Sequence, residues 1–201
     1  MADEKCEKKS EEKTERKTAR EIIENYDGPK VRIMEVCGTH THEIFRLGIR
    51  KLLPEQVELI SGPGCPVCVT PVSFIDEAIY LALEKGVTIC TFGDLVRVPG
   101  TKMSLAGARE QGADIHVVYS PADAEKYAGE HPDKQVTFLS VGFETTTPAS
   151  CLSVKAAKEN GLDNYSILTA NKTMPQAYEA LKGSADVFLY PGHVNAITGT
   201  R

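Results

Sequence analysis

The side chains best suited to chemistry are three cysteines in two short segments. Residues 61–68 read SGPGCPVC, so Cys65 and Cys68 stand three positions apart among two glycines and two prolines. Glycine admits positive φ and proline fixes φ near about −65°, so this composition favours a shaped loop that holds both thiols in place. The third thiol, Cys37, begins the segment CGTHTH at residues 37–42. Thiols in such an arrangement can close a disulfide or share a metal.

The Cys65/Cys68 pair allows three interpretations. A structural zinc site would need four ligands, which these two thiols and Cys37 could complete with a histidine of residues 37–42. A thioredoxin-like redox motif would place the pair at a helix start. Here the helix start signal, Thr-Pro at 70–71, follows Cys68, so both thiols are expected in the loop itself. A metal site other than zinc, with redox-active thiols, is the third interpretation.

Cys37 is expected at the end of a strand and just before a helix. The N-terminus of a helix favours negative charge, and therefore favours a thiolate over a thiol. Gly38 would allow a ligand to approach closely, and His40 and His42 lie on the next turn. The alternative is a small buried residue at a strand end, because free cysteine is often buried.

Apolar β-branched runs alternate with stretches of helical periodicity along most of the chain. The runs are residues 31–36, 57–60, 87–91, 115–119, 136–141, 165–169 and 187–190. Helical stretches lie between them, at residues 44–53, 74–82, 104–111, 121–129, 148–160 and 174–182. This alternation predicts an α/β fold with mainly parallel sheets flanked by helices, arranged as two adjoining Rossmann-like α/β units.

We expect three parts along the chain. Residues 1–29 form a charged N-terminal helical segment, whose docked helix ends near the stop signal at residues 27–29. Residues 30–133 form a first α/β unit that carries the cysteine motifs, and residues 134–201 form a second, incomplete unit. The residues expected to cap helices are Thr39 or Thr41, Thr70, Ser120 and Thr147.

Polar, glycine-bearing loops follow five of the seven predicted strands, at residues 37–42, 62–68, 93–100, 142–146 and 191–195. In open parallel sheets, ligands bind outside the carboxyl ends of the strands. Five such loops therefore predict one shared cleft. Glu144, Thr145 and Thr146 offer a carboxylate and hydroxyls at a helix start, where a ligand could be oriented. His193 could donate to a ligand or bind it.

Composition and motifs exclude several functions. The 201 residues carry a net charge of −5 without a basic stripe, so no nucleic-acid partner is expected. No apolar run reaches the roughly 18 residues of a membrane span, and the charged N-terminus is not a signal peptide, so we expect a cytoplasmic protein without a membrane partner. Phosphate-binding, dinucleotide-binding and serine-hydrolase motifs are absent. Cys90 and Cys151 are expected in the core.

Five segments together resemble one family. Residues 37–42 (CGTHTH), 62–68 (GPGCPVC), 92–100 (FGDLVRVPG), 142–146 (GFETT) and 191–194 (PGHV) closely resemble the HypD family, maturation factors of [NiFe]-hydrogenase. The resemblance runs from about residue 31 to the end of the chain. It implies a scaffold on which the Fe(CN)2CO unit is assembled, together with a HypC-type small chaperone and a HypE-type cyanide donor.

The resemblance also implies roles for single residues. Cys37 would be the iron-ligating thiolate, with Cys65 and Cys68 as a redox-active pair that can also contact the metal. The other residues assigned by motif are Gly38, Thr39, His40 and His193 around the cargo, and Glu144, Thr145 and Thr146 as catalytic residues along the same cleft. The family carries a [4Fe-4S] cluster on C-terminal cysteines, and its ligands are expected to lie outside this chain, which would be a fragment or a naturally short member.

The leading hypothesis is therefore an assembly scaffold with redox-active thiols, and not a conventional turnover enzyme. Low-spin iron with cyanide and CO is a soft centre that suits thiolate and needs few protein ligands. One rival is a thiol-disulfide oxidoreductase that uses Cys65 and Cys68 alone. The other is a binding module with a structural zinc held by three cysteines and a histidine.

Overall fold

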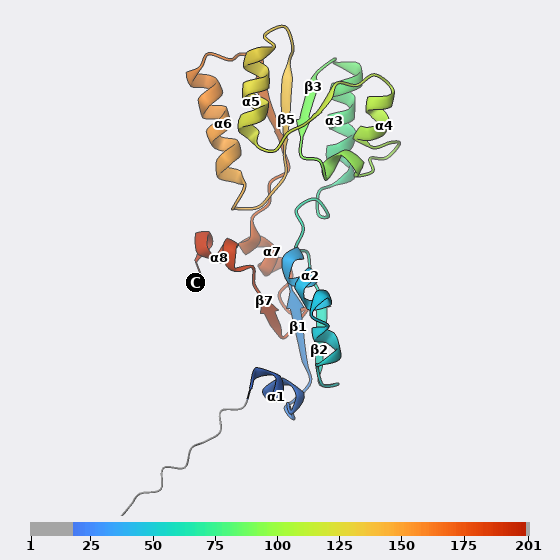
Figure 1. Cartoon of the computed structure of the whole chain (residues 1–201), viewed down its shortest axis with the longest axis vertical. Helices are drawn as coiled ribbons and strands as arrows, with labels where there is room; N and C mark the ends of the chain where they lie inside the picture. The colour runs from blue at the N-terminus through green and yellow to red at the C-terminus, as the bar shows by residue number, and fades with distance from the viewer. Residues whose placement is uncertain (1–17, 200–201) are drawn as a thin grey trace, which may run out of the picture.

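The computed structural model describes residues 18–199, which form two parallel β-sheets flanked by helices (Figure 1). The α/β fold with parallel sheets and flanking helices is confirmed. One sheet has the strand order β2–β1–β7 and the other the order β4–β3–β5–β6, and every pair within them is parallel. The strands are β1 (Val31–Glu35), β2 (Val57–Ser61), β3 (Thr88–Thr91), β4 (Ile115–Val117), β5 (Val136–Ser140), β6 (Tyr165–Thr169) and β7 (Val187–Leu189).

Helices cover both faces of the four-stranded sheet. α3 packs beside α4 and α5 beside α6, and Figure 1 shows the two pairs on opposite sides of that sheet. α2, α7 and α8 accompany the three-stranded sheet. The helices are α1 (Ala19–Glu24), α2 (Gly38–Arg46), α3 (Val72–Glu84), α4 (Leu105–Glu110), α5 (Pro121–Glu130), α6 (Thr147–Glu159), α7 (Met174–Ala180) and α8 (Gly192–Thr198), with 3-10 turns η1 (Ile49–Lys51) and η2 (Leu95–Arg97).

The chain passes between the two sheets twice. Residues 62–71 lead from β2 to α3, and residues 170–173 lead from β6 back to α7. β7 then pairs with β1, so that Met34 lies opposite Phe188. The expected boundary between residues 133 and 134 runs through the four-stranded sheet, because β3 pairs with β5 across it. The sheets therefore do not divide the chain there, and the four-stranded unit is inserted between β2 and β7.

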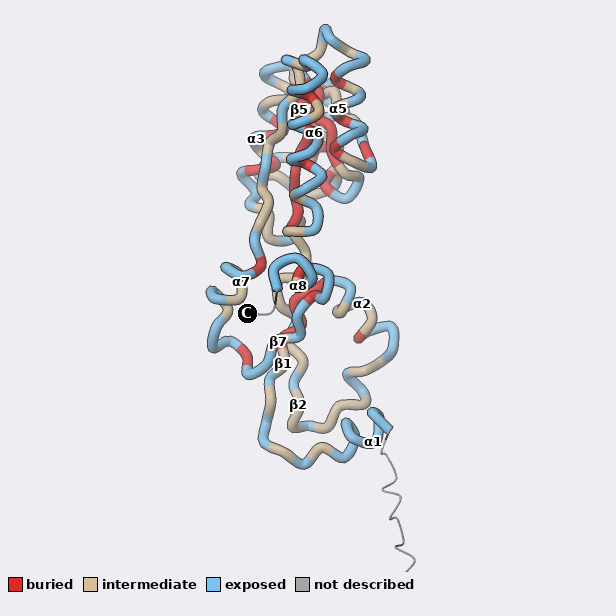
Figure 2. Tube along the Cα trace, turned by 90° about the vertical axis from the view of Figure 1, so that its left-hand side faces the viewer, coloured by how far each residue is buried: buried red, intermediate tan, exposed pale blue. Residues whose placement is uncertain are grey.

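Burial is concentrated in the four-stranded unit, as Figure 2 shows. All residues of β3 and β5 are buried there, and Ile75, Phe138 and Leu139 are fully enclosed. The three-stranded unit has a smaller core around Met34, Val36, Met174 and Val194. Phe143, from the loop after β5, packs into this smaller core and so ties the two units together.

Several expected helix starts differ in detail. The Ser120 hydroxyl accepts the Asp123 N–H, which confirms the cap of α5. Thr70 and Thr147 instead donate their hydroxyls to carbonyl oxygens four residues earlier, those of Pro66 and Phe143. Such local bonds compete with capping. Thr39 and Thr41 lie inside α2, whose N-cap is Cys37.

The N-terminal helix also differs from the prediction. α1 begins with a capping box between Thr18 and Glu21 and ends at Glu24. Its apolar residues Ile22 and Ile23 are exposed, so it does not dock on the core as expected. The rest of the predicted charged segment, residues 1–17, lies outside the described residues. Among residues 18–199, no helix has both the length and the apolar character needed to span a membrane.

Candidate functional site

A cavity of about 460 Å³ lies where the carboxyl ends of the two sheets face each other. All five loops singled out in the sequence contribute to its wall. Seven of the predicted site residues line it: Cys37, Gly38, Thr39, Cys65, Thr145, Thr146 and His193. The other three, His40, Cys68 and Glu144, do not.

Strand order explains why these loops converge. β1 lies between β2 and β7, and β3 lies beside β5, so the chain reverses its direction across each sheet at these strands. Crevices form at such switch points, outside the carboxyl ends. The loops that follow β1, β2, β3, β5 and β7 reach the cavity, whereas those after the edge strands β4 and β6 do not. The cavity thus lies between the switch point of the three-stranded sheet and the switch point of the four-stranded sheet.

Cys37 sits at the junction between β1 and α2. It is the N-cap of α2 with an extended backbone, and only 6% of its surface is exposed. The Gly38 N–H donates to the Gly64 carbonyl at 3.4 Å. A Cβ on Gly64 would lie 2.5 Å from the backbone N of Cys37, so only glycine permits this approach. The two cysteine segments are therefore pressed together through their backbones.

Cys65 and Cys68 both lie before α3, as predicted. The Cys68 N–H points at Cys65 Sγ, 3.4 Å away. Cys65 is half-buried on the cavity wall, whereas Cys68 is exposed. The hydrogen bond with Cys65, then burial and the charge of Cys65, raise the pKa of the Cys68 thiol. Cys68 therefore holds its proton to higher pH than a free thiol would.

Metal-ligating side chains are not preassembled. Across residues 18–199, no three His, Cys, Asp or Glu side chains group closely enough to hold an ion as they stand. The expected metal ligands Cys37, Cys65 and Cys68 therefore stay a prediction. Cys90 is buried as expected, and burial raises its pKa to about 12. Cys151 is exposed on α6 instead of lying in the core. The described residues thus do not fit a [4Fe-4S] cluster.

Glu144 serves a neighbouring helix. Its Oε1 accepts the backbone N–H of Met174 at 2.7 Å, which places a carboxylate at the start of α7. Its Oε2 is buried without a partner among the described residues. Thr145 and Thr146 do reach the wall, and the Thr146 hydroxyl donates to the Phe143 carbonyl. The loop therefore presents the hydroxyl-bearing residues Thr145 and Thr146 to the cavity, whereas its carboxylate binds the start of α7.

Of the three histidines in the predicted loops, only His193 lines the cavity. His193 is exposed at the rim of the cavity, in the first turn of α8. His40 lies off the wall, and its Nδ1 is buried without a partner in the described part of the chain. His42 is exposed and contacts Glu43 at 3.2 Å.

Sequence reasoning missed the apolar part of the wall, which is formed by Val67, Phe92, Leu95, Val141 and Phe143. Each lies within or beside a predicted loop, but apolar side chains there carry no chemical signal. Tyr178 was missed as well. Burial, followed by the nearby Tyr190, Glu144 and Cys37, raises the pKa of Tyr178 to about 12, and its hydroxyl is buried without a partner among residues 18–199.

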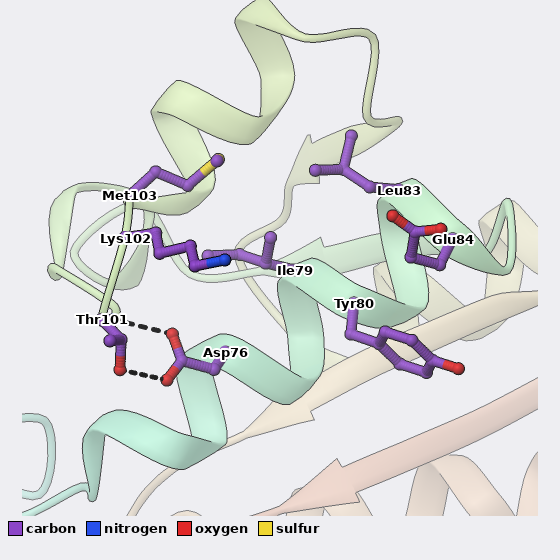
Figure 3. Close-up of a pocket in the computed structure, with 8 residues that line it drawn as sticks. All are labelled: Asp76, Ile79, Tyr80, Leu83, Glu84, Thr101, Lys102 and Met103. Atoms are coloured by element: carbon purple, nitrogen blue, oxygen red, sulfur yellow. Dashed lines mark hydrogen bonds between the residues drawn. The ribbon is translucent and has the colours of Figure 1, made fainter.

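A second cavity, of about 380 Å³, lies beside α3 and contains none of the predicted site residues (Figure 3). Asp76 accepts hydrogen bonds from the hydroxyl and the backbone N–H of Thr101, and these bonds lower the pKa of Asp76. A Cβ on Gly100 would lie 2.6 Å from Asp76 Oδ1. The end of the 92–100 segment is therefore anchored to α3, while its beginning lines the first cavity.

Comparison with known proteins shows to which family the chain belongs. A family model for HypD, described as "Hydrogenase formation hypA family", matches residues 13–201. The hydrogenase maturation factor HypD of Cupriavidus necator is 46% identical over 185 residues, which cover 87% of this chain and 49% of that protein. The Escherichia coli factor of the same name is 47% identical over 174 residues, covering 85% of this chain and 47% of that protein.

A third relative is similar over a comparable length. A putative hydrogenase expression/formation protein of Methanocaldococcus jannaschii is 43% identical over 175 residues, covering 86% of this chain and 49% of that protein. The names of these relatives describe hydrogenase formation or maturation. The chain belongs to the HypD family. It spans about half the length of the curated relatives it matches.

Proposed function

We propose that this chain takes part in [NiFe]-hydrogenase maturation as a scaffold on which the Fe(CN)2CO unit is assembled, with the iron held as cargo by the thiolate of Cys37. One observation carries the proposal. The cavity between the facing sheet edges holds Cys37 and Cys65 on one wall. Family membership supports the role, since the relatives are named hydrogenase maturation factors.

The wall suits such a cargo chemically. A soft thiolate is the ligand that low-spin iron with cyanide and CO prefers. Hydroxyls of Thr39, Thr145 and Thr146 can donate to cyanide nitrogens, whereas the apolar side chains around Phe92 and Phe143 suit CO. A single thiolate would leave the remaining positions of the iron to the diatomic ligands and to a partner.

The Cys65/Cys68 pair is proposed to serve the same cargo. Closing a disulfide between these residues would release two electrons and two protons, and the iron unit under assembly would be the acceptor. Cys65 on the wall could alternatively act as a transient second ligand. Cys68 is exposed, and the raised pKa of its thiol keeps it protonated to a higher pH than a free thiol.

The proposed partners are a HypC-type small chaperone and a HypE-type cyanide donor, which meet the chain in the cytoplasm. They would reach the cargo at the rim of the cavity, where Gly38, Thr39, Thr145 and His193 are exposed. These partners follow from the family resemblance.

The proposal is tested with anaerobically purified protein, co-produced with the other maturation factors. Iron content and infrared bands of cyanide and CO are measured for the wild type, Cys37→Ala and Cys151→Ala. Cys151→Ala removes an exposed thiol on α6, so it is the matched control. We expect iron and diatomic bands in the wild type and the control and their loss in Cys37→Ala. Retention of both in Cys37→Ala would overturn the proposal.

The second candidate function is a thiol-disulfide oxidoreductase, favoured by the contact between the Cys68 N–H and Cys65 Sγ and by the exposure of Cys68. This function needs Cys65 and Cys68 and is indifferent to Cys37. If Cys37→Ala leaves hydrogenase maturation intact while Cys65→Ala abolishes it, the oxidoreductase is the better description.

A further inference from the structure

Glu35 is a fully buried carboxylate that the function proposed above does not use. It ends β1, two residues before Cys37, and none of its surface is exposed. Its neighbours Met34 and Val36 belong to the core of the three-stranded unit. A buried carboxylate is costly unless it is paired and hydrogen-bonded. The groups that bind the Glu35 carboxylate therefore indicate its structural role.

Two hydroxyls and one cation satisfy it. The Thr41 hydroxyl donates to Glu35 Oε2 at 2.7 Å, and the Ser61 hydroxyl donates to Oε1 at 2.6 Å. Arg50 Nη2 lies 3.8 Å from Oε1. The same guanidinium donates to the Leu59 carbonyl at 2.8 Å, so Arg50 is held against β2. We call Glu35, Thr41, Ser61 and Arg50 the Glu35 network.

The two hydroxyls belong to the two segments that carry the cavity thiols. Thr41 lies in the first turns of α2, the helix that Cys37 caps, and its N–H donates to the Cys37 carbonyl. Ser61 is the last residue of β2, after which the chain runs through Gly64 to Cys65. One carboxylate thus joins the segment of Cys37 to the segment of Cys65.

Backbone contacts place the same two segments next to each other. The Gly62 N–H donates to the Glu35 carbonyl at 2.8 Å, and the Gly38 N–H reaches the Gly64 carbonyl at a longer 3.4 Å. The backbone contact nearest the cysteines is therefore the weaker one. The side chain of Glu35 adds two further short bonds between these segments, through Thr41 and Ser61.

We propose that Glu35 is a positioning residue that fixes Cys37 against Cys65 through its bonds to Thr41 and Ser61. It does not line the cavity and touches no cargo. The inference deepens the proposed function and rests on it for its purpose, because the spacing of these two thiols decides whether iron held by Cys37 can meet Cys65. The position of Cys37 relative to Cys65 can be measured whether or not the protein carries iron.

The test measures that spacing directly. Bifunctional thiol reagents with a short graded series of spacers bridge Cys37 to Cys65 in a Cys68→Ser background, and peptide mass spectrometry gives the bridging rate for each spacer. Cys68 is replaced because it contacts Cys65. We expect Thr41→Val and Ser61→Ala each to slow the fastest bridge about fivefold, as expected when one such hydrogen bond is lost, and to broaden the spacer optimum.

The matched control is Thr137→Val. The Thr137 hydroxyl bonds Ser166 at 2.8 Å between β5 and β6, far along the chain from both thiols, so this variant loses a comparable buried bond elsewhere. Its bridging rate should equal that of the background protein, while denaturant unfolding shows a loss of stability similar to that of the test variants. Equal slowing in all three variants would mean a general loosening and would overturn the proposal, as would no slowing in Thr41→Val and Ser61→Ala.

Substitutions of Glu35 itself complete the test. In Glu35→Gln, one amide oxygen and one amide NH2 can still bond both hydroxyls, since a hydroxyl can donate or accept. We expect bridging close to the background rate in this variant and slow, unselective bridging in Glu35→Leu. Slow bridging in both would overturn the proposal. Retention of iron in Cys37→Ala would contradict the proposed function. The bridging rates, which are measured in proteins that keep Cys37, would still decide the role of Glu35.

Discussion

At the scale of single residues, the site depends on one glycine as much as on its thiols. Gly64 lies against the backbone of Cys37, and any side chain there would force the two cysteine segments apart. Gly192, at the start of α8 near the same cavity, has open space where a Cβ would point. The pair allows a matched comparison of a crowded and an uncrowded glycine.

Gly64→Ala is expected to lower the free energy of unfolding by about 1–3 kcal/mol, the usual cost of overpacking. Gly192→Ala should change it by less than about 0.5 kcal/mol, as for an open surface position. Urea denaturation at neutral pH measures both. Equal stability of the two variants would show that the Cys37 and Gly64 backbones are not in close contact.

Cys68 gives a prediction about reactivity. Its raised pKa is caused chiefly by Cys65, so Cys65→Ala should lower that pKa, and Cys68 should become alkylated at lower pH than in the wild type. The rate of alkylation is followed by mass spectrometry of the Cys68 peptide across a pH series. The Cys151 peptide of the same samples serves as the internal reference. An unchanged or higher midpoint for Cys68 would contradict the contact between the two cysteines.

At the scale of elements, the edge opposite the site is held by a polar cluster. Asp114, just before β4, accepts hydrogen bonds from Lys134 Nζ at 2.9 Å, from the Thr88 hydroxyl at 2.7 Å and from His116 Nε2 at 2.8 Å. Burial opposes the charge of Asp114, but these bonds outweigh it and lower the pKa to about 2. They join the starts of β3, β4 and β5, on which the loops at the other end depend.

Because the pKa of Asp114 is lower in the folded protein than its ordinary value of 3.8, its contribution to stability is complete above about pH 4 and is lost as the pH falls towards 2. At pH 7, Asp114→Asn should lower the free energy of unfolding by about 1 kcal/mol, a modest value because 40% of the Asp114 side chain is exposed. Urea denaturation between pH 3 and 7 should show the difference from wild type shrinking with acidity. A difference that does not depend on pH would rule out this role.

Sequence patterns predicted the elements well because each one is encoded locally. β-branched runs such as residues 136–140 and the Ser120 cap are recognisable without knowledge of the fold. The cavity was predictable for a similar reason, since glycine-bearing loops after strands mark the carboxyl edge. Local patterns do not show which strands pair, so the pairing of β1 with β7 was not foreseen.

The direction of side chains within the loops was equally hidden. Glu144 bonds the start of α7 and His40 lies off the wall, although both stand next to residues that line it. Glu35 could have been noticed as one of two charged residues, with Arg32, in the run of residues 31–36, followed two residues later by Cys37. Its meaning depends on Ser61, whose place beside it arises only when β1 and β2 pair in register.

At the scale of the whole molecule, one unit is formed by a continuous stretch of the chain and the other by two separate stretches. The four-stranded unit is continuous from α3 to β6 and contains the larger core, whereas the three-stranded unit needs both ends of the described chain. Residues 72–170 produced alone are therefore expected to unfold cooperatively on heating, because their core is self-contained. Residues 18–71, which lack β7, should not.

Circular dichroism during thermal unfolding tests both pieces. The full chain is the control, and the position of its main transition shows how much stability residues 72–170 retain on their own. A cooperative transition in residues 18–71, or its absence in residues 72–170, would contradict the division into an inserted unit and a surrounding unit.

The pairing of β7 with β1 also has a consequence for synthesis, because the strand that precedes Cys37 is completed only when β7 has left the ribosome. The Arg32 N–H finds its acceptor in Asp186, 154 residues further along, and Val36, next to Cys37, bonds the Leu189 carbonyl. At about 5–20 residues per second, that distance takes on the order of 10–30 s to synthesise. Cys37 is thus among the earliest cysteines to be made, yet its strand is completed only after the four-stranded unit has emerged. A nascent chain therefore exposes this thiol long before its strand is complete. If Cys37 holds the proposed cargo, loading is expected only after β7 has paired with β1.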